Sequence, residues 1–222
     1  MKRILPFKIG NIYGITEGGG GGLINLYDED ILTRPGSIGK PTFNTEARIV
    51  DEDGNDVPVG EVGELILRGS RNMKEYFKNP DMTAVALQDG WLYTGELARK
   101  DGGGYFYIVD RKKDLIIRGG ENIFPVEIED YLRHHTKVRD VAVIGYPHPR
   151  LVEIVMAIIQ PHPGEIMEEK DVVEFCALHG LAKYKWPERI VFDAVIRNET
   201  GKIDKPRLRE KYLSGKKTVA VR

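Results

Sequence analysis

The chain is poor in cysteine and in long hydrophobic runs, and it carries almost no net charge. Cys176 is the only cysteine among 222 residues, so no disulfide can form within the chain and nothing indicates an oxidising compartment. The longest uninterrupted apolar run, 154–159, has six residues, whereas a membrane-spanning helix needs about 20. With 33 basic and 34 acidic residues the formal net charge is -1, which excludes a strong overall attraction to nucleic acid. We therefore predict a globular cytoplasmic protein with no nucleic-acid partner and no integral membrane segment.

Metal-binding and phosphate-loop patterns are also missing. The five histidines show neither HExxH nor Cys/His spacing, so the sequence does not predict a zinc site. The glycine-rich run 18–22 lacks the Lys and Ser/Thr of a phosphate loop and is predicted to be a linker. The basic stretch 197–222, with nine Lys or Arg against three Asp or Glu, could meet phosphates or simply be solvated. Its last part, 215–222, is predicted to be a flexible tail.

Turn signals divide the first half of the chain into short strands. Asp-Gly and glycine-rich turns at 51–55, 89–90 and 101–104 flank segments of β character, among them 47–50 and 63–68. One short helix is expected at 81–87. Residues 1–110 are therefore predicted to form a mostly β region.

The pattern changes to alternating helices and strands after residue 110. Pro125 suits the first position of a helix, and Ile128 and Leu132 share one face of it. The remaining elements are predicted as strands at 138–144, 154–160 and 189–192, and helices at 168–179 and 206–213. The fold class is α+β, with a second unit at 111–214.

Three motifs in a fixed order carry the functional interpretation. The stretch Asp110–Glu129 joins a strand, a glycine turn and a helix that starts at a proline, an arrangement that packing alone rarely requires. With Tyr13-Gly-Ile-Thr-Glu17 upstream and Thr200-Gly-Lys-Ile203 downstream, it resembles the adenylate-forming (AMP-binding) superfamily, of the acyl-CoA synthetase or acid:CoA ligase type. The resemblance runs from residue 13 to about 208 and covers only the C-terminal portion of such an enzyme. It implies a β-barrel-like remnant of the large AMP-binding domain at 1–110 and a mobile C-terminal lid at 111–214.

Forming an acyl adenylate brings a carboxylate against the α-phosphate of ATP, so a positioned cation is needed. A lysine on a Thr-Gly-Lys loop can supply it, and by resemblance Lys202 is the catalytic lysine. A lone Gly-Lys is more often an ordinary surface turn. The order of the motifs favours the functional reading.

The resemblance also implies a nucleotide site. Tyr13 would lie on adenine, Thr16 would contact a phosphate, and Glu17 would bind Mg²⁺. Glu96 and Arg111 would hold the ribose hydroxyls, although the family usually has Asp where this chain has Glu96, which puts nucleotide affinity in question. The alternatives are a turn capped by Thr16 and Glu17 and an exposed ion pair between Glu96 and Arg111.

Lys113 matches the family's hinge, about which the lid rotates between the adenylation and thioester-forming steps. In the second pose Gly119 and Gly120 would border the tunnel for the CoA pantetheine, where a missing side chain lets the backbone approach a thin ligand. The alternative is a turn whose glycines only satisfy backbone geometry. Val152 stands where the family often has a glycine before an acid, here Glu153.

Three functions remain open on the sequence. The chain is the C-terminal part of an ATP-dependent carboxylic acid:CoA ligase and inactive alone, or one half of a split enzyme, or a non-catalytic module that binds CoA or phosphopantetheine. The first implies ATP or AMP, Mg²⁺ and coenzyme A as cofactors and a carboxylic acid as substrate. It also requires a missing N-terminal part or a separate chain, because the large sheets that build an acyl pocket have no counterpart here.

Overall fold

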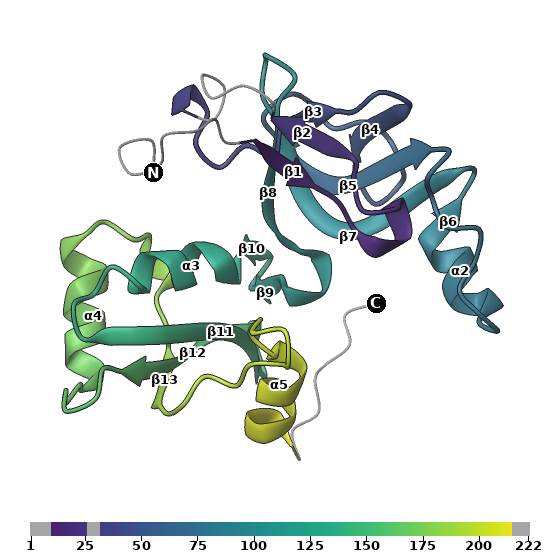
Figure 1. The fold of residues 1–222 in the computed structure, drawn as a ribbon. Helices are drawn as coiled ribbons and strands as arrows, with labels where there is room; N and C mark the ends of the chain where they lie inside the picture. Colours follow the sequence, from purple (N-terminus) through teal and green to yellow (C-terminus); the bar gives the residue numbers. More distant parts are fainter. Residues whose placement is uncertain (1–9, 26–31, 215–222) are drawn as a thin grey trace. The chain divides into compact units, whose positions relative to one another are not determined.

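The computed structural model describes residues 10–25 and 32–214 (Figure 1). The chain divides after Lys112 into two compact units. The mobile-lid role expected for the second unit remains a prediction, and the predicted tail at 215–222 lies outside the described residues. In the described ranges, no helix combines the length and the apolar character that crossing a bilayer requires.

The first unit is built from two sheets. The smaller is antiparallel with the order β1-β2-β3, and the larger has the order β4-β5-β7-β6, with β8 paired to β7. The strands are β1 (Asn11–Tyr13), β2 (Leu23–Asn25), β3 (Lys40–Pro41), β4 (Thr45–Val50), β5 (Val62–Gly69), β6 (Leu87–Gln88), β7 (Trp91–Lys100) and β8 (Phe106–Arg111). A 3-10 helix, η1 (Thr16–Gly18), and a short helix, α2 (Pro80–Ala86), complete it.

The strands and the helix predicted for this unit are present, but its sheets do not close into a barrel within the described residues. The strands predicted at 47–50 and 63–68 are β4 and β5, paired antiparallel, and the helix predicted at 81–87 is α2, capped by the Asn79 side chain, which accepts from Met82 N at 3.1 Å. A bridge between Gly39 and Phe106 links β8 to the chain just before β3. No closed barrel forms within the described residues, so the barrel-like remnant is more accurately two linked sheets around one core: Leu23, Ile49, Leu65, Leu67, Ala98 and Phe106.

As far as the structure describes it, up to residue 214, the second unit is a five-stranded sheet with three α-helices. It contains η2 (Lys112–Asp114, shared with the end of the first unit), β9 (Ile116–Arg118), β10 (Glu121–Ile123), α3 (Pro125–Leu132), β11 (Val138–His148), β12 (Val152–Pro161), α4 (Glu169–Leu178), η3 (Lys183–Lys185), β13 (Arg189–Phe192) and α5 (Lys205–Leu213). The strand order is β10-β9-β12-β11, and β13 joins β12 in parallel. This mixture of helices and strands confirms the α+β class.

Both faces of this sheet are covered, which explains the continuous apolar runs of its central strands. Alternate residues of β11 and β12 point to opposite sides. Val141, Val143 and Val155 pack with α3 and α4, whereas Ala142 and Ile144 pack with α5. The helices α3 and α4 therefore cover one face of the sheet, and α5 covers the other. The loop that carries Lys202 enters α5 and is therefore built on the α5 face.

Candidate functional site

Three of the predicted nucleotide residues lie together in the first unit. Glu96 on β7 and Arg111 at the end of β8 are direct partners across the two strands, and Arg111 Nε lies 3.9 Å from Glu96 Oε1. Tyr13, at the end of β1, is close enough to be affected by both: burial and the Glu96 carboxylate raise the pKa of its phenol, and Thr94 and Arg111 act in the opposite direction. The Tyr13 hydroxyl is buried and makes no hydrogen bond of good geometry with the described residues.

The part of β7 that presents Glu96 is a register irregularity against β5, and contacts with β5 hold it. Thr94 Oγ1 donates to Leu65 O at 2.6 Å and accepts from Glu96 N at 3.1 Å. Gly95 has φ +70°, a left-handed conformation that glycine adopts without strain. Its amide donates to Glu64 Oε1 at 3.0 Å. The Glu96 carboxylate therefore projects from an irregular but well-held segment of β7.

Glu64 also links this segment of β7 to the end of the first unit. Its carboxylate is nearly buried, with 9% of the side chain exposed, and Oε2 accepts from Lys112 Nζ at 2.8 Å. One carboxylate therefore holds both the Gly95 amide and the residue that precedes Lys113. A charged hydrogen bond to a buried carboxylate is among the stronger polar contacts.

The predicted magnesium residue is held by an aromatic hydroxyl. Thr16 and Glu17 lie in η1, with Thr16 exposed and Glu17 half-buried. Glu17 Oε1 accepts from Tyr76 OH at 2.8 Å, and burial together with this carboxylate raises the pKa of Tyr76. No cluster of three or more metal-ligating side chains occurs in the described ranges. A single oriented carboxylate fits Mg²⁺ bound mainly through water and phosphate oxygens.

Lys113 is the first residue of the second unit. It is exposed, and its carbonyl accepts from Arg209 Nη2 at 3.5 Å. The next residue, Asp114, is buried and pairs with Arg209 at 2.9 Å. The predicted hinge therefore lies between a neighbour held in the first unit by Glu64 and a neighbour held in the second by Arg209.

Gly119 and Gly120 form the two-residue turn between β9 and β10. Both have positive φ, +59° and +94°, which is the conformation of a type I′ hairpin. The Gly119 amide donates to Leu151 O at 2.8 Å, and a side chain at Gly119 would press on Leu151 Cδ2 at 3.2 Å. The backbone conformation alone accounts for these two glycines, and the tunnel role stays a prediction.

Lys202 projects from a loop organised around one side chain. Asn198 Oδ1 accepts from Thr200 N at 3.1 Å, from Thr200 Oγ1 at 2.8 Å and from Lys202 N at 3.0 Å. The Asn198 backbone pairs with Lys202 O and Gly201 N, both at 2.9 Å. Lys202 itself is exposed. The loop thus holds the Lys202 backbone, and no side chain in the described ranges forms an ion pair with its ammonium group.

Two family models match the chain, in the order in which the motifs occur. The model described as AMP-binding enzyme matches residues 1–77, and the model described as AMP-binding enzyme C-terminal domain matches residues 127–202. The first match contains Tyr13, Thr16 and Glu17, and the second ends at Lys202. The chain belongs to the AMP-binding enzyme family.

Curated relatives of this chain include acid:CoA ligases. It is 42% identical to the long-chain-fatty-acid–CoA ligase FadD13 of Mycobacterium tuberculosis over 201 residues, which is 90% of this chain and 39% of that protein. It is 39% identical to a feruloyl-CoA synthase of an Amycolatopsis species, over 96% of this chain and 43% of that protein. The chain thus spans about two fifths of the length of the curated relatives it matches.

Solved structures of AMP-binding enzymes share the fold. ATP-bound MatB from Rhodopseudomonas palustris matches with a TM-score of 0.84 and 35% identity, over 93% of this chain and 41% of that one. The o-succinylbenzoate-CoA synthetase MenE of Bacillus subtilis, in complex with ATP and a magnesium ion, matches with a TM-score of 0.81 and 34% identity, over 91% of this chain and 42% of that one.

Several residues around the AMP-binding motifs were not predicted from the sequence. Tyr76 contacts Glu17 from 59 positions away, and Glu64 contacts Gly95 from 31 positions away, so no local pattern connects them. The family resemblance in the sequence did single out Val152, and this residue has φ +69°. A β-branched residue rarely adopts this conformation, so Val152 occupies a backbone geometry better suited to glycine.

Proposed function

We propose that this chain is the C-terminal part of an ATP-dependent carboxylic acid:CoA ligase. The reaction joins a carboxylate to ATP to give acyl-AMP and pyrophosphate, and the thiol of CoA then displaces AMP to give acyl-CoA. The observation that carries the proposal is the cluster of Tyr13, Glu96 and Arg111 in the first unit, within a chain whose second unit matches the family's C-terminal domain.

The first unit would bind the nucleotide. The Glu96 carboxylate can accept from both ribose hydroxyls while Arg111 donates to one of them, and the Tyr13 ring offers a flat apolar face to adenine. The exposed Thr16 hydroxyl can donate to a phosphate oxygen. Glu17, oriented by Tyr76, would hold Mg²⁺, which neutralises charge on the polyphosphate when it is bound.

The second unit would supply the catalytic cation and the thiol path. Lys202 lies on an ordered loop and would place its ammonium between the substrate carboxylate and the α-phosphate, where negative charge accumulates. A turn about Lys113 would then withdraw Lys202 and bring Gly119 and Gly120 to the pantetheine.

The remaining parts of the ligase would come from outside this chain. The relatives are about two and a half times as long as the matched region, so we propose that the acyl pocket is supplied by an N-terminal part or a separate chain. The carboxylic acid is proposed to be a fatty or aromatic acid, the substrate classes that the relatives' names indicate. The cytoplasm is the proposed compartment.

A chimera tests the proposal. This chain replaces the corresponding 201 residues of the ligase to which it is 42% identical, and the two half-reactions are assayed separately. Adenylation is followed by acid-dependent exchange of pyrophosphate into ATP, and thioester formation by adding CoA to preformed acyl-AMP. We expect both to proceed. Lys202→Ala should lower adenylation by at least about 100-fold, because a group that stabilises transition-state charge is typically worth that much, and it should spare thioester formation.

Lys170→Ala provides the matched control. Lys170 is exposed, and within the described residues its ammonium forms an ion pair only with the exposed Glu168. Both half-reactions should therefore be unchanged in Lys170→Ala. Equal loss of both half-reactions in Lys202→Ala would remove the role assigned to Lys202. If the chimera folds but shows neither activity, and calorimetry shows that this chain alone binds CoA, the ligase proposal is wrong and the chain is a CoA-binding module.

A further inference from the structure

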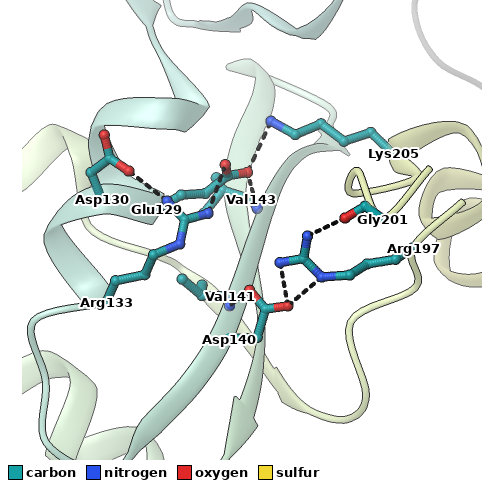
Figure 2. Close-up of polar contacts among 9 residues, drawn as sticks. All are labelled: Glu129, Asp130, Arg133, Asp140, Val141, Val143, Arg197, Gly201 and Lys205. Carbon is teal, nitrogen blue, oxygen red and sulfur yellow. Dashed lines mark hydrogen bonds and ion pairs between the residues drawn. The ribbon is translucent and has the colours of Figure 1, made fainter. Parts of the chain in front are cut away.

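The loop that carries Lys202 is fastened to the sheet just before the lysine. Arg197, at the start of the loop, directs Nε and Nη2 to Asp140 Oδ2 at 2.9 and 2.6 Å. Its remaining nitrogen, Nη1, donates to Gly201 O at 2.6 Å. Figure 2 shows the guanidinium between the Asp140 carboxylate and the Gly201 carbonyl. One side chain therefore connects β11 to the residue that precedes Lys202.

Asp140 is itself held in place. It follows a register irregularity in β11, and Oδ1 accepts from Val141 N at 3.0 Å. Only 15% of its side chain is exposed, against 44% for Arg197. The carboxylate is therefore a fixed point on the sheet, and the more exposed guanidinium depends on it for its orientation.

A second contact fastens the chain just after the lysine. Lys205 Nζ lies 2.9 Å from Glu129 Oε1 on α3, with 8% and 4% of the two side chains exposed. Asp204 caps α5 by accepting from Arg207 N at 3.1 Å. The segment 198–204 is thus held at both ends, and these contacts are independent of the Asn198 network inside it.

We propose that Asp140 is a positioning residue for Lys202, acting through Arg197 and the Gly201 carbonyl. This inference rests on the proposed function, in which Lys202 meets the reacting carboxylate and phosphate. Asp140 contacts neither. It sets the position of the Gly201–Lys202 peptide, and a displacement of about 1 Å at a reacting group can cost about 100-fold in rate.

Nuclear magnetic resonance of the whole 222-residue chain tests the structural half without any activity. In the unaltered chain we expect the amides of Gly201 and Lys202 to show order parameters of about 0.85, as in rigid backbone. Asp140→Asn removes the charge that orients Arg197, and the order parameters at these two amides should fall below about 0.6. Arg197→Lys should have the same effect, because a lysine cannot bind Asp140 and Gly201 O with a planar fork.

Glu127→Gln is the matched control. Glu127 lies on α3 and pairs with Lys185 on η3, so its loss should leave the amides of Gly201 and Lys202 unchanged. If Asp140→Asn and Arg197→Lys are folded and both leave these amides rigid, Asn198 alone orders the loop and the proposal is overturned.

The chimera tests the functional half. Asp140→Asn should lower the adenylation kcat by about tenfold to 100-fold, with the KM for ATP and the thioester half-reaction unchanged. A purely structural defect would lower both half-reactions together and would overturn the positioning role. If Lys202→Ala has no effect on adenylation, the proposed function fails instead, whatever the order parameters show.

Discussion

The buried ion pair between Glu129 and Lys205 permits a prediction with a large expected magnitude. The two groups are almost fully enclosed, at 4% and 8% exposure and 2.9 Å apart. Glu129 Oε1 also accepts from Val143 N at 2.8 Å, and Arg133 Nη2 lies 3.6 Å from the other carboxylate oxygen, Oε2. Figure 2 shows the carboxylate between these groups. Burial raises the pKa of Glu129 in spite of them.

Removing one partner should cost far more than removing both. Glu129→Met leaves the Lys205 ammonium buried without a counterion, and we expect a loss of about 3–5 kcal/mol in the free energy of unfolding. Lys205→Met should cost less, because Arg133 and the Val143 amide still face the carboxylate. Replacing both by Met should bring stability back to within about 1 kcal/mol of the unaltered chain.

The cost of Lys205→Met should also depend on pH. Because the pKa of Glu129 is raised, the folded state takes up the proton more readily than the unfolded state. The stabilisation from protonation is therefore complete below the ordinary pKa of 4.5 and is lost as pH rises through the folded-state pKa. Lys205→Met should thus be least harmful in acid, whereas Glu129→Met should show no such relief.

The two tryptophans allow the second unit to be followed alone. Trp91 belongs to the first unit, and Trp186 belongs to the second, where its indole donates to Leu181 O at 2.7 Å. In a Trp91→Phe background, Trp186 fluorescence in urea reports only the unit that contains the ion pair. With a slope of about 1.5 kcal/mol per molar urea, a loss of about 3 kcal/mol lowers the midpoint by about 2 M. A double variant as unstable as Glu129→Met would refute the reasoning.

Three further results are expected. Val152→Gly should be more stable than Val152→Ala by about 1 kcal/mol in urea titration, because φ +69° strains any side chain; alanine above glycine, the ordinary strand order, would contradict the strain. Hydrogen bonds from Lys211, Tyr212 and the Ala194 amide lower the pKa of Asp193 from 3.8 to about 2. The stability advantage over Asp193→Asn, below about 1 kcal/mol at a partly exposed site, should therefore be present above pH 3.8 and shrink toward pH 2; a pH-independent difference would contradict this. Glu96→Asp in the chimera should keep or improve the KM for ATP, and a tenfold increase would mean that the site is adapted to glutamate.

The sequence predicted those elements whose pattern is local. The strand expected at 189–192 is β13 with the same bounds, and the helix expected at 206–213 is α5, which starts one residue earlier. Proline at the first turn and apolar periodicity are sufficient for such elements. The strands β9 and β10 have three residues each, too few for a period to show, and were not predicted individually.

The candidate site divides in the same way. Residues inside a motif, such as Tyr13 and Lys202, could be proposed from order and spacing. The side chains that hold these motifs in place could not be predicted in this way. Asp140 meets Arg197 across 57 positions and Glu129 meets Lys205 across 76, and such contacts exist only after the sheet has formed. Charged residues at these positions are indistinguishable in the sequence from a solvated surface.

The two residues that flank Lys113 are both held by ion pairs, which limits how the chain could rotate there. The Lys112 side chain is held by Glu64 and the Asp114 side chain by Arg209, so Lys113 is the one residue between these two contacts. A hinge at Lys113 would have essentially the two backbone torsions of that residue as its freedom. A unit of this size is about 30 Å across, so a change of about 10° in one torsion displaces its far edge by about 5 Å. A small rotation at Lys113 would therefore give a large displacement at the far edge of the second unit.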